Sequence, residues 1–210
     1  KDAFFSTGQN ITWNVNSVDD LSPIYTDNVY FSLYKNFQND SRDRFYGNTA
    51  LTYEVNDWLS LLGRVTYDGY SEIREERIDV GSADVSNYTV TNRKSSEINY
   101  DVMATANKRF NDLTIDGLAG FNIRANKYNY FAASTNGGLV TPGLFPLSNT
   151  VNPLTSSNIG KVDYTKKVDG VFGKIGLGYK GTYYLDITGR RDRSSTLPMA
   201  NNKYLDPSAS

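Results

Sequence analysis

The acidic residues that could do chemistry in this sequence gather shortly before residue 80. Four carboxylates alternate there with two arginines: Glu72, Arg74, Glu75, Glu76, Arg77 and Asp79. A hydrolase could use a pair of such carboxylates, one as acid and one as base. Charged side chains of this kind mostly remain in water, however. We therefore interpret the cluster as a solvated, charged rim where a strand leads into a loop.

Other catalytic or metal-binding sets are absent from the sequence. Asn39, Asp40 and Asp43 offer oxygens but lack the spacing of a calcium-binding EF-hand. The chain has 0 His and 0 Cys, which excludes Ser-His-Asp and Cys-His catalysis as well as thiolate metal sites. We expect no enzymatic activity, no catalytic residue, no metal and no cofactor. With 22 basic and 23 acidic residues, the chain is also a poor candidate for nucleic-acid binding.

The elements that must position any functional residues repeat with a period of two. Residues 45–55 and 59–68 alternate between apolar and polar side chains, and Asn56-Asp57 separates them as a tight turn. The same unit recurs twice, with turns at Asn111-Asp112 and at 180–182. We expect these three hairpins, and a further strand near residues 11–15.

Long connections join the hairpins, at 80–94, 132–163 and 196–207. Loops of this length are uncommon in compact soluble domains. Aromatic residues also lie near both ends of the apolar phase, with aliphatic residues between them. Short turns, long loops and two aromatic bands are typical of outer-membrane barrels. The fold class expected is all-β: a sector of an antiparallel transmembrane β-barrel, with short periplasmic turns and long extracellular loops.

The opposite phase of the strands is polar and would face the barrel lumen. Its side chains could contact a solute or a plug, although hydration or ion pairing between strands explains them as well. This predicted set comprises Arg64, Asp68, Asn99, Asp101, Asp116, Asn122, Arg124, Asp186 and Arg190. Candidate contacts at the loops are Tyr128, Tyr130, Phe131 and Asn149.

Several segments resemble the SusC/RagA class of TonB-dependent outer-membrane transporters of Bacteroidota. The most specific is YLDITGRRDRSSTLP at 184–198, which is similar to the family's YLDVTGRNDWSSTLP, with Ile187 in place of Val and with departures at Arg191 and Arg193. The other matching segments, in chain order, are FFSTG at 4–8, NVYF at 28–31, DSRDRFYGN at 40–48, DWL at 57–59 with Gly63-Arg64, GLVTPGL at 138–144 with LSN at 147–149, and YLDPS at 204–208.

The resemblance implies that residues 1–210 are a part of such a barrel, without the plug and the N-terminal regions. The whole protein would import nutrients, oligosaccharides or peptides, across the outer membrane. A SusD-like surface lipoprotein would cap it, TonB would act through a region absent here, and lipid would surround it. Two alternatives stay open: a small complete barrel that acts as a passive pore or anchor, and a soluble β-sandwich binding module.

Overall fold

The computed structural model describes residues 7–210, so the FFSTG segment at 4–8 lies outside the described residues as far as Ser6. The chain is antiparallel and all-β, as the alternation predicts. Its strands are β1 (Gln38–Asn56), β2 (Leu59–Ile78), β3 (Asn87–Phe110), β4 (Leu113–Ser134), β5 (Asn136–Leu139), β6 (Thr150–Asn152), β7 (Ile159–Tyr179), β8 (Tyr183–Ser194) and β9 (Lys203–Ala209). A short helix, α2 (Val29–Lys35), precedes β1, and two 3-10 turns span Ser156–Asn158 and Met199–Asn201.

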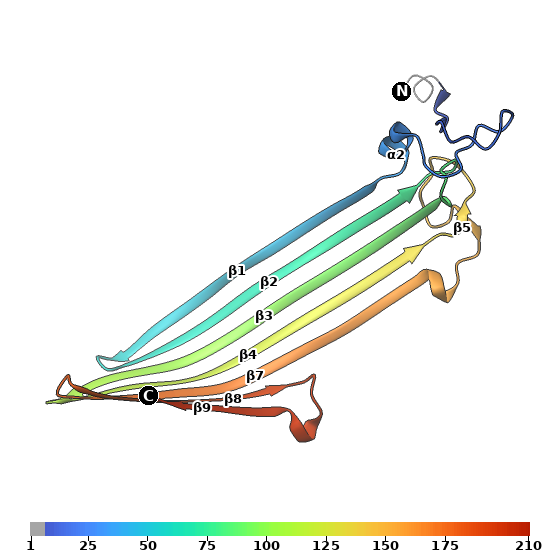
Figure 1. Ribbon diagram of the computed structural model, residues 1–210. Coiled ribbons are helices and arrows are strands. Elements are labelled where there is room, and N and C mark those ends of the chain that lie inside the picture. The colour runs from blue at the N-terminus through green and yellow to red at the C-terminus, as the bar shows by residue number, and fades with distance from the viewer. Residues whose placement is uncertain (1–6) are drawn as a thin grey trace. The chain divides into compact units, whose positions relative to one another are not determined.

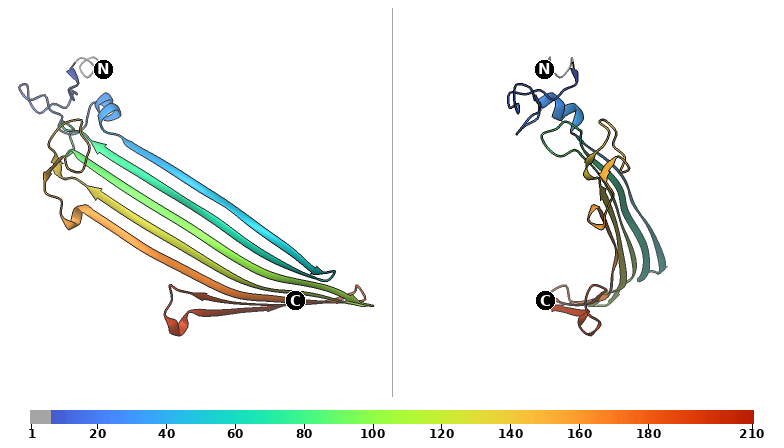
Figure 2. Two further views of the ribbon diagram at one scale, coloured as in Figure 1. Left: turned by 180° about the vertical axis from the view of Figure 1, so that it is seen from behind. Right: turned by 90° about the vertical axis from the view of Figure 1, so that its right-hand side faces the viewer.

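Seven strands form one sheet, in the order β1-β2-β3-β4-β7-β8-β9 (Figure 1). They lie side by side in a single layer (Figure 2), while β5 and β6 form a separate two-stranded sheet. Each predicted hairpin is present. In β7 and β8 the register pairs Ile175 with Ile187 and Tyr179 with Tyr183. No helix within residues 7–210 has the length and apolar content needed to cross a membrane.

The structure corrects several predicted boundaries. The first turn lies at Asp57-Trp58, one residue later than expected. The connection predicted at 80–94 is confined to 79–86 because β3 begins at Asn87, and the connection at 132–163 is shortened by the ends of β4 and β7. The last five residues of the loop predicted at 196–207 belong to β9.

The strand predicted near 11–15 is wrong. Only an isolated bridge between Val15 and Pro23 forms in this segment. The Asn14 side chain accounts for the difference, because its carbonyl oxygen accepts bonds from the backbone of Ile24 and Tyr25 at 3.0 and 3.1 Å. Its amide donates to Thr26. The segment is thus held by one buried side chain rather than by a strand ladder.

The chain divides into two compact units. Unit 1 comprises Lys1–Asp43, Ser71–Lys94 and Asn129–Asp163, and unit 2 comprises Arg44–Tyr70, Ser95–Tyr128 and Tyr164–Ser210. The four buried hydrophobic side chains of the described residues all belong to unit 1: Phe31, Tyr88, Ala133 and Leu139. Unit 1 also contains five of the six buried polar side chains, and Asp101 of unit 2 is the sixth.

Unit 2 keeps its large apolar side chains on the outside. Leu51 is 75% exposed, Val102 59%, Ile175 56% and Ile187 50%. All four belong to the apolar phase read from the sequence. A soluble protein would bury such residues under a second layer. In unit 2 a single sheet therefore separates two surfaces of different chemistry.

Candidate functional site

The two surfaces of unit 2 can be assigned from contacts between neighbouring strands. Phe45 and Tyr67 pack on the apolar surface, with ring centroids 6.0 Å apart. The adjacent residues Arg44 and Asp68 form an ion pair at 2.6 Å. Because successive side chains of a strand point to opposite sides, this pair lies on the other surface. We call these surfaces the apolar face and the polar face of unit 2.

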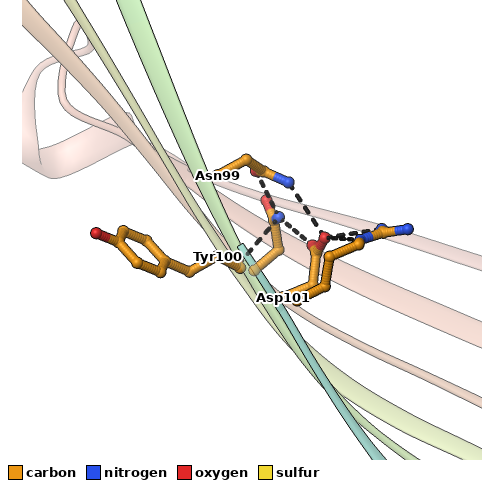
Figure 3. A network of polar contacts seen from close by, with 5 residues as sticks. Asn99, Tyr100 and Asp101 are labelled. Atoms are coloured by element: carbon orange, nitrogen blue, oxygen red, sulfur yellow. Dashed lines mark hydrogen bonds and ion pairs between the residues drawn. The ribbon is translucent and has the colours of Figure 1, made fainter. Parts of the chain in front are cut away.

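A hydrogen-bond network on the polar face is centred on Asp101. Figure 3 shows Asn99 and Asp101 pointing to one side of β3 and Tyr100 to the other. Arg64 on β2 approaches Oδ2 of Asp101 through Nε at 2.8 Å and through Nη2 at 2.7 Å. Asn122 on β4 donates to Oδ1 of Asp101 at 2.6 Å and to the Asn99 side chain at 2.8 Å. Three strands are thus joined through one carboxylate.

Because Asp101 is buried, its hydrogen-bond donors are important for the stability of the sheet. The Asp101 side chain is 8% exposed, whereas Arg64 is 44% exposed. A buried carboxylate without donors would be costly, and here Asn99, Asn122 and Arg64 all donate to it. Four residues of the predicted polar set therefore meet at one point, where each satisfies the others.

The remaining members of the predicted set pair separately along the same face. Asp68 pairs with Arg44, as described above. Asp186 lies 3.0 Å from the Lys174 ammonium, and Arg190 lies 2.7 Å from Asp192. The Asp116 carboxylate accepts a bond from the side chain of Asn107. Ion pairing between strands, one of the two interpretations open from the sequence, accounts for Asp68 and Asp186, whereas Arg190 pairs within β8 and Asp116 bonds to a neutral amide.

Arg124 differs from the other members of the set. No ion pair involving its guanidinium is formed within residues 7–210. It lines a pocket of about 330 Å³, together with Glu97 of β3 and Lys166 of β7. The sequence reading missed Glu97 and Lys166, although both share the strand phase of the polar face.

The aromatic candidates have different surroundings. In unit 2 the ring of Tyr128 stacks on that of Tyr164, with centroids 5.2 Å apart and planes 25° from parallel. In unit 1 the Arg93 guanidinium lies 5.7 Å from the centroid of the Tyr130 ring. Phe131 is 37% exposed. Each of the three rings keeps a partly open surface.

Asn149 has a structural role within the loop of unit 1. Its side chain is buried, and its oxygen accepts a bond from Thr141 N at 2.9 Å. Its amide donates to the carbonyls of Thr141 and Leu144 at 2.8 and 2.6 Å. These three bonds hold the segment 141–149 closed. Asn149 thus braces its own loop, and its contact with a solute stays a prediction.

The acidic cluster before residue 80 is not a uniformly solvated rim, and this corrects the sequence interpretation. Asp79 is 2% exposed, and its Oδ1 accepts bonds from the backbone N–H groups of Val80 and Gly143 at 2.8 and 2.7 Å. The Lys35 ammonium lies 3.5 Å from its Oδ2. Asp79 thus ties the loop around Gly143 to the end of β2. The two-residue alternation carries no signal for such a contact.

Glu75 and Arg77 from the same cluster also form a defined structure in unit 1. The Tyr88 hydroxyl donates to Glu75 at 2.6 Å, and Arg77 pairs with Glu75 at 2.9 Å. The Arg77 guanidinium lies 5.0 and 5.3 Å from the ring centroids of Phe37 and Phe145. Burial, followed by the bond to Glu75, raises the pKa of Tyr88 to about 12. Tyr88 therefore remains a hydrogen-bond donor at neutral pH.

Comparison with solved structures places this fold. A chain of the RagAB peptide transporter matches with a TM-score of 0.78 and 15% sequence identity, and the match covers 91% of this chain and 23% of that chain. The RagAB peptide importer in its closed-closed state matches with a TM-score of 0.76, at the same identity and coverage. The chain has the fold of one sector of these transporter chains.

At this level of identity the likeness concerns the fold alone. The described chain spans about a quarter of the length of the RagAB chains that it matches. No protein-family model and no curated protein matches the sequence.

Proposed function

We propose that this chain is a sector of the wall of an outer-membrane nutrient importer of the SusC/RagA kind, without enzymatic activity. The apolar face of unit 2 meets lipid, and the polar face lines the lumen. One observation carries the proposal: Ile175 and Ile187 are paired across β7 and β8 and are both half exposed, while Lys174 and Asp186 form an ion pair on the opposite face. This alternation suits a lipid boundary on one side and water on the other.

The aromatic residues near the turns support the same orientation. Tyr179 and Tyr183 are paired beside the turn at 180–182, and both are exposed. The Lys108 ammonium lies 5.2 Å from the centroid of the Trp58 ring and 5.8 Å from that of the Phe110 ring. Aromatic rings and snorkelling lysines are enriched where a membrane meets water. This end of unit 2 would be the periplasmic boundary.

The long connections, which join the strands at the ends away from the tight turns, would then face the outside of the cell. There they could contact the transported solute or a SusD-like lipoprotein lid, and TonB would act on another part of the protein. The solute would be a peptide or an oligosaccharide. The fold shared with the RagAB peptide transporter supports the peptide. The stacked rings of Tyr128 and Tyr164 suit either class, since both peptides and sugars pack on aromatic faces.

Both alternatives are less well supported. A passive pore made by this chain alone needs about 8 strands to close, and the described sheet has seven, with β1 and β9 at opposite edges. A soluble sandwich needs two packed sheets. Within residues 7–210 the second sheet has only two strands.

Uptake by cells tests the proposed function. The full-length protein, expressed with its lipoprotein partner, should take up fluorescent peptides or oligosaccharides in a manner that depends on TonB. Deletion of 136–158 should leave the barrel inserted but should strongly impair uptake or lid docking. Unchanged uptake after this deletion, or uptake without TonB, would contradict the proposal.

A further inference from the structure

The pocket around Arg124 is lined by charged side chains that form no ion pair within residues 7–210. Its polar lining residues all lie in unit 2: Glu97, Arg124, Asn126, Lys166, Ser194 and Thr196. Arg124 and Asn126 follow Asn122 on β4 at intervals of two, and Glu97 precedes Asn99 on β3 by two. Since Asn122 bonds to Asn99, the pocket opens on the polar face.

Neighbouring charges on this face show how unusual the pocket is. Arg44, Arg64, Lys174 and Arg190 each form an ion pair with an aspartate, at 2.6 to 3.0 Å. Within residues 7–210, no ion pair forms at Arg124, Lys166 or Glu97. Two cations and one carboxylate thus line a cavity of about 330 Å³ without forming an ion pair with one another.

We propose that this pocket binds a carboxylate group of the transported solute. The guanidinium of Arg124 can hold both oxygens of a carboxylate in parallel hydrogen bonds, and the Lys166 ammonium adds a second charge. The net charge of the pocket is +1, which matches a monoanion. A phosphate dianion would be opposed by Glu97. The hydroxyls of Ser194 and Thr196 and the Asn126 amide complete a polar lining.

A surface for the rest of the solute lies beside the two cations. The Lys166 ammonium is 4.8 Å from the centroid of the Tyr164 ring, and Tyr164 stacks on Tyr128. An apolar side chain or a sugar ring could pack there while its carboxylate occupies the pocket. The carboxylate could belong to a peptide or to a uronic acid unit of an oligosaccharide. This inference deepens the proposed import function and rests on the polar face lining the path of the solute.

Binding to the purified full-length protein tests the pocket separately from transport. The probes are a short peptide with a free C-terminal carboxylate, its C-terminal amide, a glucuronic acid oligosaccharide and its methyl ester, each with an uncharged fluorophore. Fluorescence polarisation should show tighter binding of one acid than of its neutral partner. Arg124→Gln should weaken binding of that acid about 10-fold or more and leave the neutral partner unchanged. Whichever acid responds identifies the source of the carboxylate.

Two further variants separate a contact from a folding defect. Arg124→Lys should restore part of the affinity because it restores the charge. Lys174→Gln removes a charge from the same face, but from outside the pocket, and should leave the preference for the acid intact. Equal binding of acids and neutral partners, or no loss in Arg124→Gln, would overturn the inference.

Uptake of the neutral probes shows whether the pocket proposal alone is wrong or the import function is wrong as well. If the neutral probes are imported without any preference for the acids, transport stands and the pocket proposal falls. If nothing is imported, the transport role falls, and the binding comparison still decides the pocket.

Discussion

The two units of this chain differ in the side chains that they bury and expose. Unit 1 buries four apolar side chains and five polar ones, although other apolar side chains of this unit, such as Trp13 and Val18, are exposed. Unit 2 leaves its aliphatic side chains outside and buries one polar side chain, Asp101. The contrast lies in what is buried: the buried apolar side chains of the described residues belong to unit 1, whereas the strands of unit 2 display their aliphatic side chains, as the proposed contact with lipid requires. Substitutions that exchange the two kinds of environment should therefore have very different costs.

The largest effect is expected on the apolar face of unit 2. Ile187→Arg should destabilise the full-length protein, lowering its free energy of unfolding by about 2–4 kcal/mol, because the charge would enter lipid. Thr188→Arg, one residue along the same strand, should cost much less because it points to the polar face. Folding titrations into lipid vesicles measure both. Equal losses at the two positions would contradict the assignment of the faces.

A somewhat smaller loss is expected in the Asp101 network. Asp101→Ala should cost about 2–3 kcal/mol, since it removes the acceptor of bonds from Arg64, Asn99 and Asn122. Asp68→Ala is the matched control, because its pair with Arg44 is exposed and should contribute much less to stability. Similar losses in the same titration would mean that burial of Asp101 is unimportant.

In unit 1, Asn149→Ala should loosen the loop without disturbing the barrel. Loss of three hydrogen bonds should cost about 1–2 kcal/mol locally. Faster hydrogen exchange at the amide of Thr141 and faster proteolysis within 140–149 are the expected readouts. Ser148→Ala, at an exposed neighbouring position, should change neither. Unaltered exchange in the Asn149 variant would remove its role in holding the loop.

The smallest effect depends on pH and concerns Tyr88. Because its folded-state pKa is raised from 10.0 to about 12, the protonated phenol stabilises the folded form below pH 10. This contribution should be lost as the pH rises from about 10 to about 12. Thermal melts should therefore show a steeper alkaline decline for the natural protein than for Tyr88→Phe. Parallel declines would mean that Tyr88 titrates normally.

The sequence predicted the hairpins because alternation with a period of two reports directly which side of a strand is apolar. It did not predict β9, since Asp206 and Pro207 are turn-forming residues that here pair with Arg190 and Gly189 at the sheet edge. The strand predicted near 11–15 failed for a related reason. Its local pattern suits a strand, but the Asn14 side chain replaces the ladder.

The candidate site was predictable in position but not in pairing. The two-residue alternation places Asp101 and Arg124 on one face. Only the arrangement of the strands shows that Asp101 accepts bonds from three side chains, whereas Arg124 forms no ion pair within residues 7–210. Asn149 illustrates the limit in a loop, because an amide can equally serve a solute or its own backbone. Asp79 shows the same limit, because its partner Gly143 is 64 residues away and the local sequence pattern cannot predict that contact.

The central claim is that the even-numbered side chains of β8 face water and the odd-numbered ones face lipid. Single cysteines placed in turn from Tyr183 to Arg190 in the full-length protein, spin-labelled in a lipid bilayer, test it most directly. This chain has 0 native Cys. Accessibility to oxygen, which concentrates in lipid, should peak at Leu185, Ile187 and Gly189, and accessibility to a water-soluble nickel complex should peak at Tyr184, Asp186 and Thr188. A uniform profile, or the opposite phase, would contradict the account.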